Sequence, residues 1–293
     1  MEYMMTYGWS ILIVSIVIGI LFQFGLFNGS TFALRAQPGA CQVARPNGPS
    51  TGFASLEGQC TNELPKWVSN FTNPGGPTSL GQYAVINGIT TAKTQSAMTL
   101  SVWLKGPVLN QGYESVFVGT ADSSNYGWYL YAWNLAVMKF EANVMGTYYS
   151  IQPSQQSGYA PGNIWMNYII TWNSSIARGI IGYANGTLEQ TGGPVVAVPG
   201  NVISGDASAL VIAGFQNEGY GPNGQIANIQ LYNTSLSQSE VNAIYQAGVG
   251  GDPIRLQNLI GWWPLNSNAK DYSGNGNNGV PVNVPYTSSY TPP

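Results

Sequence analysis

The sequence predicts a mainly β protein in which an N-terminal hydrophobic α-helix is followed by an antiparallel β-sandwich. Three observations predict this fold class. Residues 9–27 form an uncharged apolar stretch. After about residue 79, short runs alternate polar with apolar or aromatic residues between Gly and Asn turns, as sandwich strands do. Within that region, Ser237 and Glu240 form a capping box for one helix, which Gly248 ends.

The composition excludes several function classes. Only 7% of the 293 residues are charged and none is His, whereas about 25% are charged in an ordinary soluble domain. The net charge of −3, without a Lys/Arg cluster, excludes a nucleic-acid partner. Without His or a free thiol, triad chemistry is excluded as well.

The N-terminal segment, residues 1–27, carries an uncharged apolar run of about 19 residues. As a helix, its apolar run is long enough to span a bilayer. Its charge pattern is unusual, because Glu2 is the only charge before Arg35, whereas secretory signals and membrane anchors usually carry basic flanks. A helix that is apolar on every face must be buried on every face, by lipid or by copies of itself.

Residues 1–9 (MEYMMTYGW) followed by the apolar run resemble the mature start of archaeal type IV pilin-like proteins, which carry a class III signal peptide. The resemblance implies a subunit that waits in the membrane and is then extruded, so that its helix packs in a filament core. Buried Glu2 would pair there with the N-terminal ammonium of a neighbouring subunit. A plain membrane anchor and an uncleaved secretory signal remain alternatives. The expected assembly residues are Glu2, Tyr3, Tyr7, Trp9, Gly19 and Phe27.

Residues 28–78 are rich in Gly, Pro, Ser, Thr and Asn and predict a stalk. Cys41 and Cys60 are the only cysteines, and an extracellular disulfide between them is expected to staple this segment. N-x-S/T sequons point to the same compartment and predict N-linked glycans. The glycosylation candidates are Asn28, Asn70, Asn173, Asn185 and Asn233.

Residues 79–293 carry the predicted sandwich. The ordered set of residues 98–105, 165–173 and 223–233, followed by the capped helix, resembles the laminin-G-like (concanavalin A-like) jelly roll. One departure is that residues 259–279 resemble the segment that normally opens this domain, yet here they close it. The resemblance implies a permuted order in which this segment refills its usual strand position. The alternative is donation of the strand to a neighbouring subunit.

Enzymatic activity is not expected. Glycoside hydrolases of this fold need paired carboxylates, usually at alternate positions of one strand, and no Glu-x-Asp-x-x-Glu pattern is present. The carboxylates considered instead are isolated in the sequence. They are Glu114, Asp122, Glu141, Asp206 and Glu218.

Two binding sites are candidates. Asp271, Asn275 and Asn277 form an oxygen-rich turn that suits calcium, with a self-bonded Asx-turn as the alternative. Aromatic residues predict a sugar-stacking platform, although most of them are also expected in the core or in subunit contacts. The platform candidates are Tyr126, Trp128, Tyr131, Trp133, Tyr148, Tyr149 and Tyr220.

These features predict a structural subunit of an extracellular, cell-surface type IV pilus-like adhesion filament, with helices packed in the core and glycosylated jelly rolls on the filament surface. Its partners would be copies of itself, the membrane before assembly, and carbohydrate or cell surfaces. No cofactor is expected to be required, calcium is a candidate ligand, and N-linked glycans are expected. The alternative is a membrane-anchored, monomeric glycan-binding adhesin.

Overall fold

The computed structural model describes residues 13–15, 41–44, 53–57, 64–65, 67–73, 81–89, 96–106, 114–120, 127–133, 137–153, 164–199, 209–215 and 220–288, the backbone alone before residue 67 except at 13–15. The chain divides into two compact units, Met1–Gln37 and Pro38–Pro293. In the first, residues 13–15 are helical, and the rest of the predicted helix over 1–27 lies outside the described residues. No helix in the described ranges is long and apolar enough to cross a membrane.

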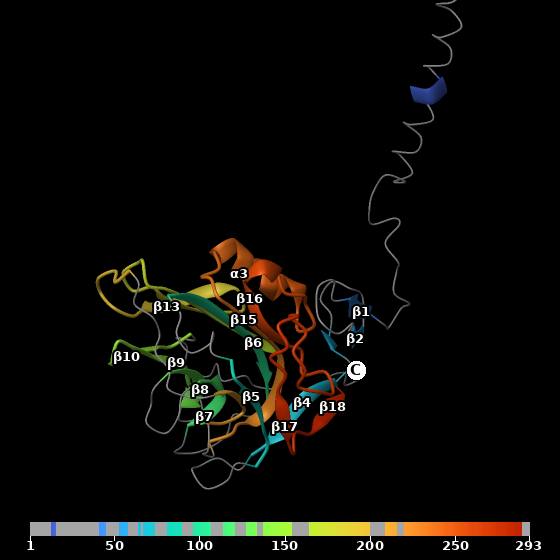
Figure 1. Cartoon of the computed structure of the whole chain (residues 1–293), viewed down its shortest axis with the longest axis horizontal. Helices are drawn as coiled ribbons and strands as arrows, with labels where there is room; N and C mark the ends of the chain where they lie inside the picture. Colours follow the sequence, from blue (N-terminus) through green and yellow to red (C-terminus); the bar gives the residue numbers. More distant parts are fainter. Residues whose placement is uncertain are drawn as a thin grey trace, which may run out of the picture. The chain divides into compact units, whose positions relative to one another are not determined.

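The second unit contains a two-sheet antiparallel sandwich, which confirms the predicted fold class for this part of the chain (Figure 1). One sheet has seven strands in the order β10–β9–β8–β7–β14–β5–β17. Their bounds are β5 Tyr83–Asn87, β7 Ser115–Gly119, β8 Trp128–Trp133, β9 Val137–Val144, β10 Thr147–Ile151, β14 Ala209–Ile212 and β17 Val280–Val282.

The other sheet has eight strands, seven of them in the order β13–β12–β11–β6–β15–β4–β18, with β16 also paired to β15. Their bounds are β4 Trp67–Thr72, β6 Ala97–Lys105, β11 Met166–Asn173, β12 Ile180–Ala184, β13 Thr187–Gly192, β15 Asn223–Tyr232, β16 Leu259–Trp263 and β18 Tyr286–Ser288. A small sheet is formed by β1 Cys41–Ala44, β2 Phe53–Glu57 and β3 Leu64–Pro65.

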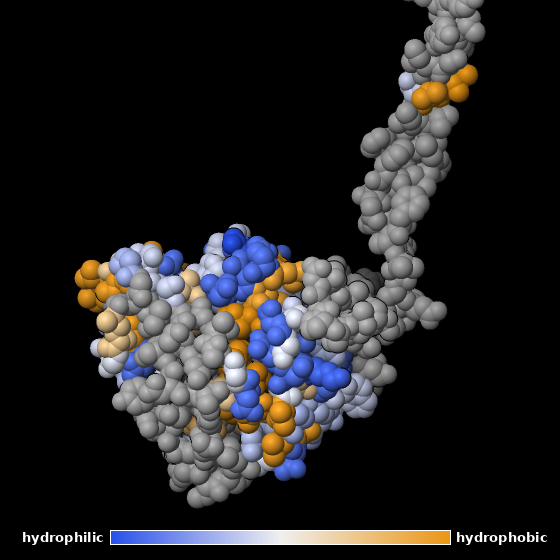
Figure 2. All heavy atoms as spheres, in the orientation of Figure 1, coloured by the Kyte–Doolittle hydropathy of each residue, from blue (hydrophilic) through white to orange (hydrophobic). Residues whose placement is uncertain are grey.

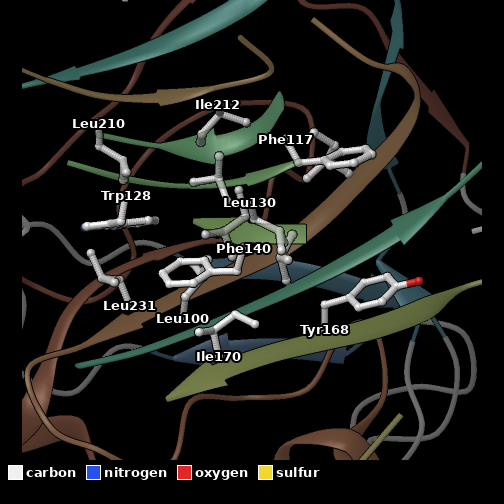
Figure 3. Packing of buried hydrophobic residues seen from close by; sticks show 14 of the residues in the cluster. Leu100, Phe117, Trp128, Leu130, Phe140, Tyr168, Ile170, Leu210, Ile212 and Leu231 are labelled. Carbon is white, nitrogen blue, oxygen red and sulfur yellow. The ribbon is translucent and has the colours of Figure 1, made fainter. Parts of the chain in front are cut away.

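The main core lies between the two large sheets. Figure 3 shows Leu210, Phe117 and Trp128 of the seven-stranded sheet on one side, with Leu100 and Ile170 of the eight-stranded sheet on the other. Along a strand, the core residues alternate, as Trp128 and Leu130 do in β8 and Leu100 and Val102 do in β6, because every second residue faces the same side. The strands predicted at 98–105, 165–173 and 223–233 are confirmed as β6, β11 and β15.

The helix α3, Gln238–Ala247, covers part of the outer face of the eight-stranded sheet. Its predicted start is confirmed, because the Ser237 backbone N–H donates to Glu240 Oε2 at 2.8 Å. Gly248 ends the helix with a φ of 82°, which favours glycine. Val241 and Ile244 are buried against the sheet in one cluster with Ile169.

A bulge in β15 allows two strands to share its edge. Residues 223–226 pair with β4 and residues 229–232 pair with β16. At the junction, buried Asn228 has a φ of 47°, donates to Gly251 O at 2.8 Å and accepts from Trp262 Nε1 at 2.7 Å. Gln230 extends this network by donating to Asn228 Oδ1 at 3.1 Å and accepting from Tyr232 Oη at 2.7 Å. The network fixes the bulge because it satisfies buried polar groups on both sides of it.

The sandwich begins before the expected boundary at residue 79. Strand β4 falls within the predicted stalk, 28–78, yet it pairs with β15 and β18. Val68 and Phe71 of β4 are both 0% exposed, so this end of the predicted stalk belongs to the sandwich.

At the other end of the chain, β16 pairs with β15, β17 with β5 and β18 with β4.

On the face shown in Figure 2, hydrophilic and hydrophobic residues are interspersed, and one of the hydrophobic groups lies at the end where β13 is labelled in Figure 1. The most exposed apolar side chains of that region include Leu188, Val195 and Val196.

Candidate functional site

The outer face of the seven-stranded sheet gathers aromatic and ionisable residues. Along β8, Trp128 and Leu130 face the core, so Tyr129, Tyr131 and Trp133 face outward. The two tyrosines are nevertheless buried, whereas Trp133 is 40% exposed. Strand β8 therefore presents aromatic residues both to the core and to the outer face of its sheet.

Glu141 of β9 binds both tyrosines. Tyr129 lies opposite Glu141 in the antiparallel register, and its hydroxyl donates to Glu141 Oε2 at 2.7 Å. The Tyr131 hydroxyl donates to Glu141 Oε1 at 2.6 Å. Burial, reinforced by the hydrogen bond to Glu141, raises the pKa of both hydroxyls far above the usual range, so both keep their protons.

Two more ionisable groups act on this face. Lys139 Nζ lies 6.0 Å from the ring centroid of Tyr131 and 5.4 Å from that of Trp133, within the range of a cation–π contact. Glu114 lies directly before β7, and burial followed by repulsion from Glu141 raises the pKa of its carboxyl, while Lys139 opposes this. Two carboxyl groups that are isolated in the sequence are thus brought within electrostatic range of each other.

A second aromatic group borders these residues. Phe215 packs edge-on against Tyr129, with ring centroids 5.0 Å apart, and Tyr220 packs edge-on against Phe215 at 5.6 Å. The Tyr220 carbonyl accepts from the Val116 N–H at 2.7 Å, which anchors the segment to β7. These contacts hold Tyr129 in one orientation, so its hydroxyl is pre-positioned. We call Tyr129, Tyr131, Trp133, Lys139 and Glu141 the outer aromatic face.

The predicted sugar platform is divided by the structure. Trp128 is fully buried in the main core, and the partly buried Tyr149 packs against that core. Tyr131 and Trp133 belong to the outer aromatic face. Of the remaining candidates, Tyr148 is exposed on β10, Tyr220 lies beside Phe215, and Tyr126 is outside the described residues. Sequence reasoning missed Tyr129, although the two-residue period of β8 was a signal for it. It set Glu141 aside as an isolated carboxylate.

The Asp271 turn is held by its own hydrogen bonds. Asp271 Oδ1 accepts from the N–H groups of Trp262 and Ser273 at 3.0 and 2.7 Å. Its Oδ2 accepts from Ser273 Oγ and the Asn277 N–H, both at 2.9 Å. The amide groups of Asn275 and Asn277 donate to Ile260 O at 3.0 and 2.8 Å. This arrangement corresponds to the Asx-turn alternative, and the described residues contain no group of three acidic, His or Cys side chains suited to a metal.

The other expected site residues are distributed as follows. The sequon residues Asn70, Asn173 and Asn185 are half-buried and Asn233 is exposed. The side-chain oxygen of Asn185 accepts from the Asn167 N–H at 2.9 Å, and that of Asn233 accepts from Asn258 Nδ2 at 2.9 Å. The predicted sites that lie outside the described residues or side chains are Asn28, Cys41, Cys60, Glu2, Tyr3, Tyr7, Trp9, Gly19 and Phe27. Of the carboxylates considered isolated, Asp122, Asp206 and Glu218 also lie outside the described residues.

Comparison with known proteins identifies the sandwich. The family described as the concanavalin A-like lectin/glucanases superfamily matches residues 78–242, more than half of the chain. No curated protein sequence matches the chain. Among solved structures, a candidate carbohydrate-binding protein from Bacteroides ovatus has a TM-score of 0.53 at 11% identity, over 82% of this chain and 64% of that one.

Two further structures are more distant. A SAP-like pentraxin from Limulus polyphemus has a TM-score of 0.43 at 17% identity, over 61% of this chain and 82% of that one. A sialidase CBM40 domain from Ruminococcus gnavus, bound to sialyllactose, has a TM-score of 0.43 at 15% identity, over 58% of this chain and 96% of that one.

Proposed function

Because the chain belongs to the concanavalin A-like lectin/glucanases superfamily, we propose that its sandwich binds carbohydrate on the outer aromatic face. The observation that carries the proposal is Trp133, an exposed ring beside two tyrosine hydroxyls that share Glu141. Sugar sites need an apolar ring against which a sugar face packs and a few fixed polar groups that orient its hydroxyls. The similarity to a candidate carbohydrate-binding protein from Bacteroides ovatus supports the proposal.

Binding is favoured over catalysis by the state of the two carboxyl groups. The family description includes glucanases as well as lectins, and glycoside hydrolysis needs one carboxyl group as acid and another as base or nucleophile. Both oxygens of Glu141 already accept tyrosine protons, which weakens the carboxylate as a base or nucleophile. We therefore assign Glu141 an orienting role.

A matched pair of tryptophans tests the proposal. Trp133 and Trp67 are similarly exposed, at 40% and 38%, but Trp67 lies on β4 of the other sheet. On a glycan array and by calorimetry with the best ligand, Trp133→Ala should weaken binding about tenfold, as loss of a central aromatic contact does. Trp67→Ala should bind like the wild type. Equal affinity of all three proteins for every bound glycan contradicts this assignment of the site.

The filament role remains a separate proposal about residues 1–27. It is supported by the resemblance to pilin-like sequences and by the apolar run. Electron microscopy of material sheared from producing cells, with mass spectrometry of the same fraction, tests it. Regular fibres composed of this chain, lost in Glu2→Ala, support a subunit whose sandwich forms the outer surface. Detergent-extracted single particles support the membrane-anchored, glycan-binding alternative instead.

A further inference from the structure

We propose that the carbohydrate bound on the outer aromatic face carries free amino groups, as a glucosamine oligomer does, and that anionic sugars are rejected. This inference rests on the proposed function and adds the chemical class of the ligand. It follows from which hydrogen-bonding groups the face offers and from the charge that it carries.

The hydrogen-bonding groups of this face are mainly acceptors. A tyrosine hydroxyl has one proton, and the protons of Tyr129 and Tyr131 are both donated to Glu141, at 2.7 and 2.6 Å. Because both tyrosines are buried, their hydroxyls orient Glu141, and the half-buried Glu141 carboxylate is the acceptor that a ligand can reach. Glu141 is acceptor-only, and its two oxygens provide about four lone-pair positions, of which the tyrosines occupy two. A ligand that meets these groups must supply protons.

The charge of the face favours a cationic donor. Glu141 and Glu114 are two carboxyl groups that interact repulsively, and burial further disfavours the ionised form of Glu114. Lys139 is the cation among them, and its ammonium lies over the Tyr131 and Trp133 rings. A ligand ammonium would relieve the repulsion between the carboxylates. A ligand carboxylate would add to it and would meet oxygens that cannot donate.

Three hexasaccharides provide the test by calorimetry at fixed pH and ionic strength. Hexaglucosamine and hexa-N-acetylglucosamine differ only in their acetyl groups, and hexagalacturonate is the anionic counterpart. For the wild-type chain, we expect hexaglucosamine to bind about tenfold more tightly than its acetylated form, as for one added charge-assisted hydrogen bond. Hexagalacturonate should show no measurable binding.

Variants separate this acceptor geometry from general electrostatic attraction. Glu141→Gln retains a side chain of similar shape but replaces one acceptor oxygen with a donor. The affinities of this variant for the two glucosamine oligomers should therefore differ by no more than about twofold. Asp252→Asn removes the same charge at an exposed position after α3 and should leave the tenfold ratio intact. Lys139→Gln removes the competing cation and should increase the ratio, which provides a second test if Glu141→Gln does not fold.

The possible failures are distinguishable. If the acetylated or anionic oligomer binds as tightly as hexaglucosamine and Trp133→Ala weakens that binding, the amine preference is wrong and the sugar site stands. If Glu141→Gln and Asp252→Asn lower the ratio equally, general attraction explains it and the inference is overturned. If none of the three oligomers binds, the inference is overturned, and the array comparison of Trp133→Ala with Trp67→Ala decides the proposed function.

Discussion

Replacing Asp271 with Ala should cost the sandwich about 3 to 4 kcal/mol of unfolding free energy. The carboxylate is only 4% exposed and accepts four hydrogen bonds. Three of its donors are backbone N–H groups, and a buried donor without a partner costs about 1–3 kcal/mol. Trp262 is 3% exposed, so its unpaired N–H group should cause the full penalty. Ser273 and Asn277 are half-buried, so water can replace part of the lost hydrogen bonding to their N–H groups.

Urea unfolding followed by tryptophan fluorescence measures this loss. The midpoint should fall with an unchanged slope, because the surface exposed on unfolding is nearly the same. Asp271→Asn retains one acceptor oxygen and should lose an intermediate amount. Asp252→Ala removes an exposed carboxylate from the neighbouring segment and should change stability by less than about 0.5 kcal/mol.

The same measurement separates the hydrogen-bonded turn from a calcium site. If hydrogen bonds alone hold the turn, wild-type stability is the same with calcium as with a chelator. If Asp271 holds calcium, chelation destabilises the wild type and leaves Asp271→Ala unaffected, because a ligand that binds only the folded state stabilises it. If Asp271→Ala loses less than about 1 kcal/mol of unfolding free energy, the hydrogen bonds to Asp271 do not stabilise the turn to the expected extent.

Two further predictions concern the β15 network and the outer aromatic face. Gln230→Leu should cost about 2–3 kcal/mol in urea unfolding, because it leaves the buried Tyr232 hydroxyl without its acceptor. Adding Tyr232→Phe to Gln230→Leu should recover part of this loss. If the stability losses of the two single variants simply add in the double variant, the two side chains are not coupled and the prediction is wrong. The melting temperature of Glu114→Gln should equal that of the wild type at pH 4 and exceed it at pH 7. The pKa of Glu114 is raised in the folded state, so the wild type loses stability as pH rises from the unfolded pKa through the folded one. A wild type that gains stability relative to Glu114→Gln over this range contradicts the assignment.

Local features of the sequence predicted the main strands and the helix. Strands β6 and β11 alternate apolar residues with Thr, Ser or Asn, so their two-residue period is visible in the sequence. The start of α3 was predictable because Ser237 and Glu240 are close in sequence and act on the same helix end. In these cases, the interaction that decides the structure lies within one element.

The remaining features depend on contacts between distant segments. Strand β4 lies in a turn-rich stretch, and it belongs to the sandwich because β15 and β18, far along the chain, pair with it. Glu141 appeared isolated because its partner Tyr129 is set by the register of β8 and β9, which the sequence does not state. A two-residue period assigns a side chain to one face of a sheet but leaves open which face is the core.

The two outer faces of the sandwich differ in how they are covered. The eight-stranded sheet is partly covered by α3, and its buried polar groups, such as Gln230, are bonded within the network around Asn228. Substitutions there should therefore affect stability first. The outer aromatic face has no helix over it among the described residues, and its Trp133 ring is exposed. Since exposed side chains contribute little to folding, loss of Trp133 should reduce binding without reducing stability, and this separation of effects is what a binding face requires.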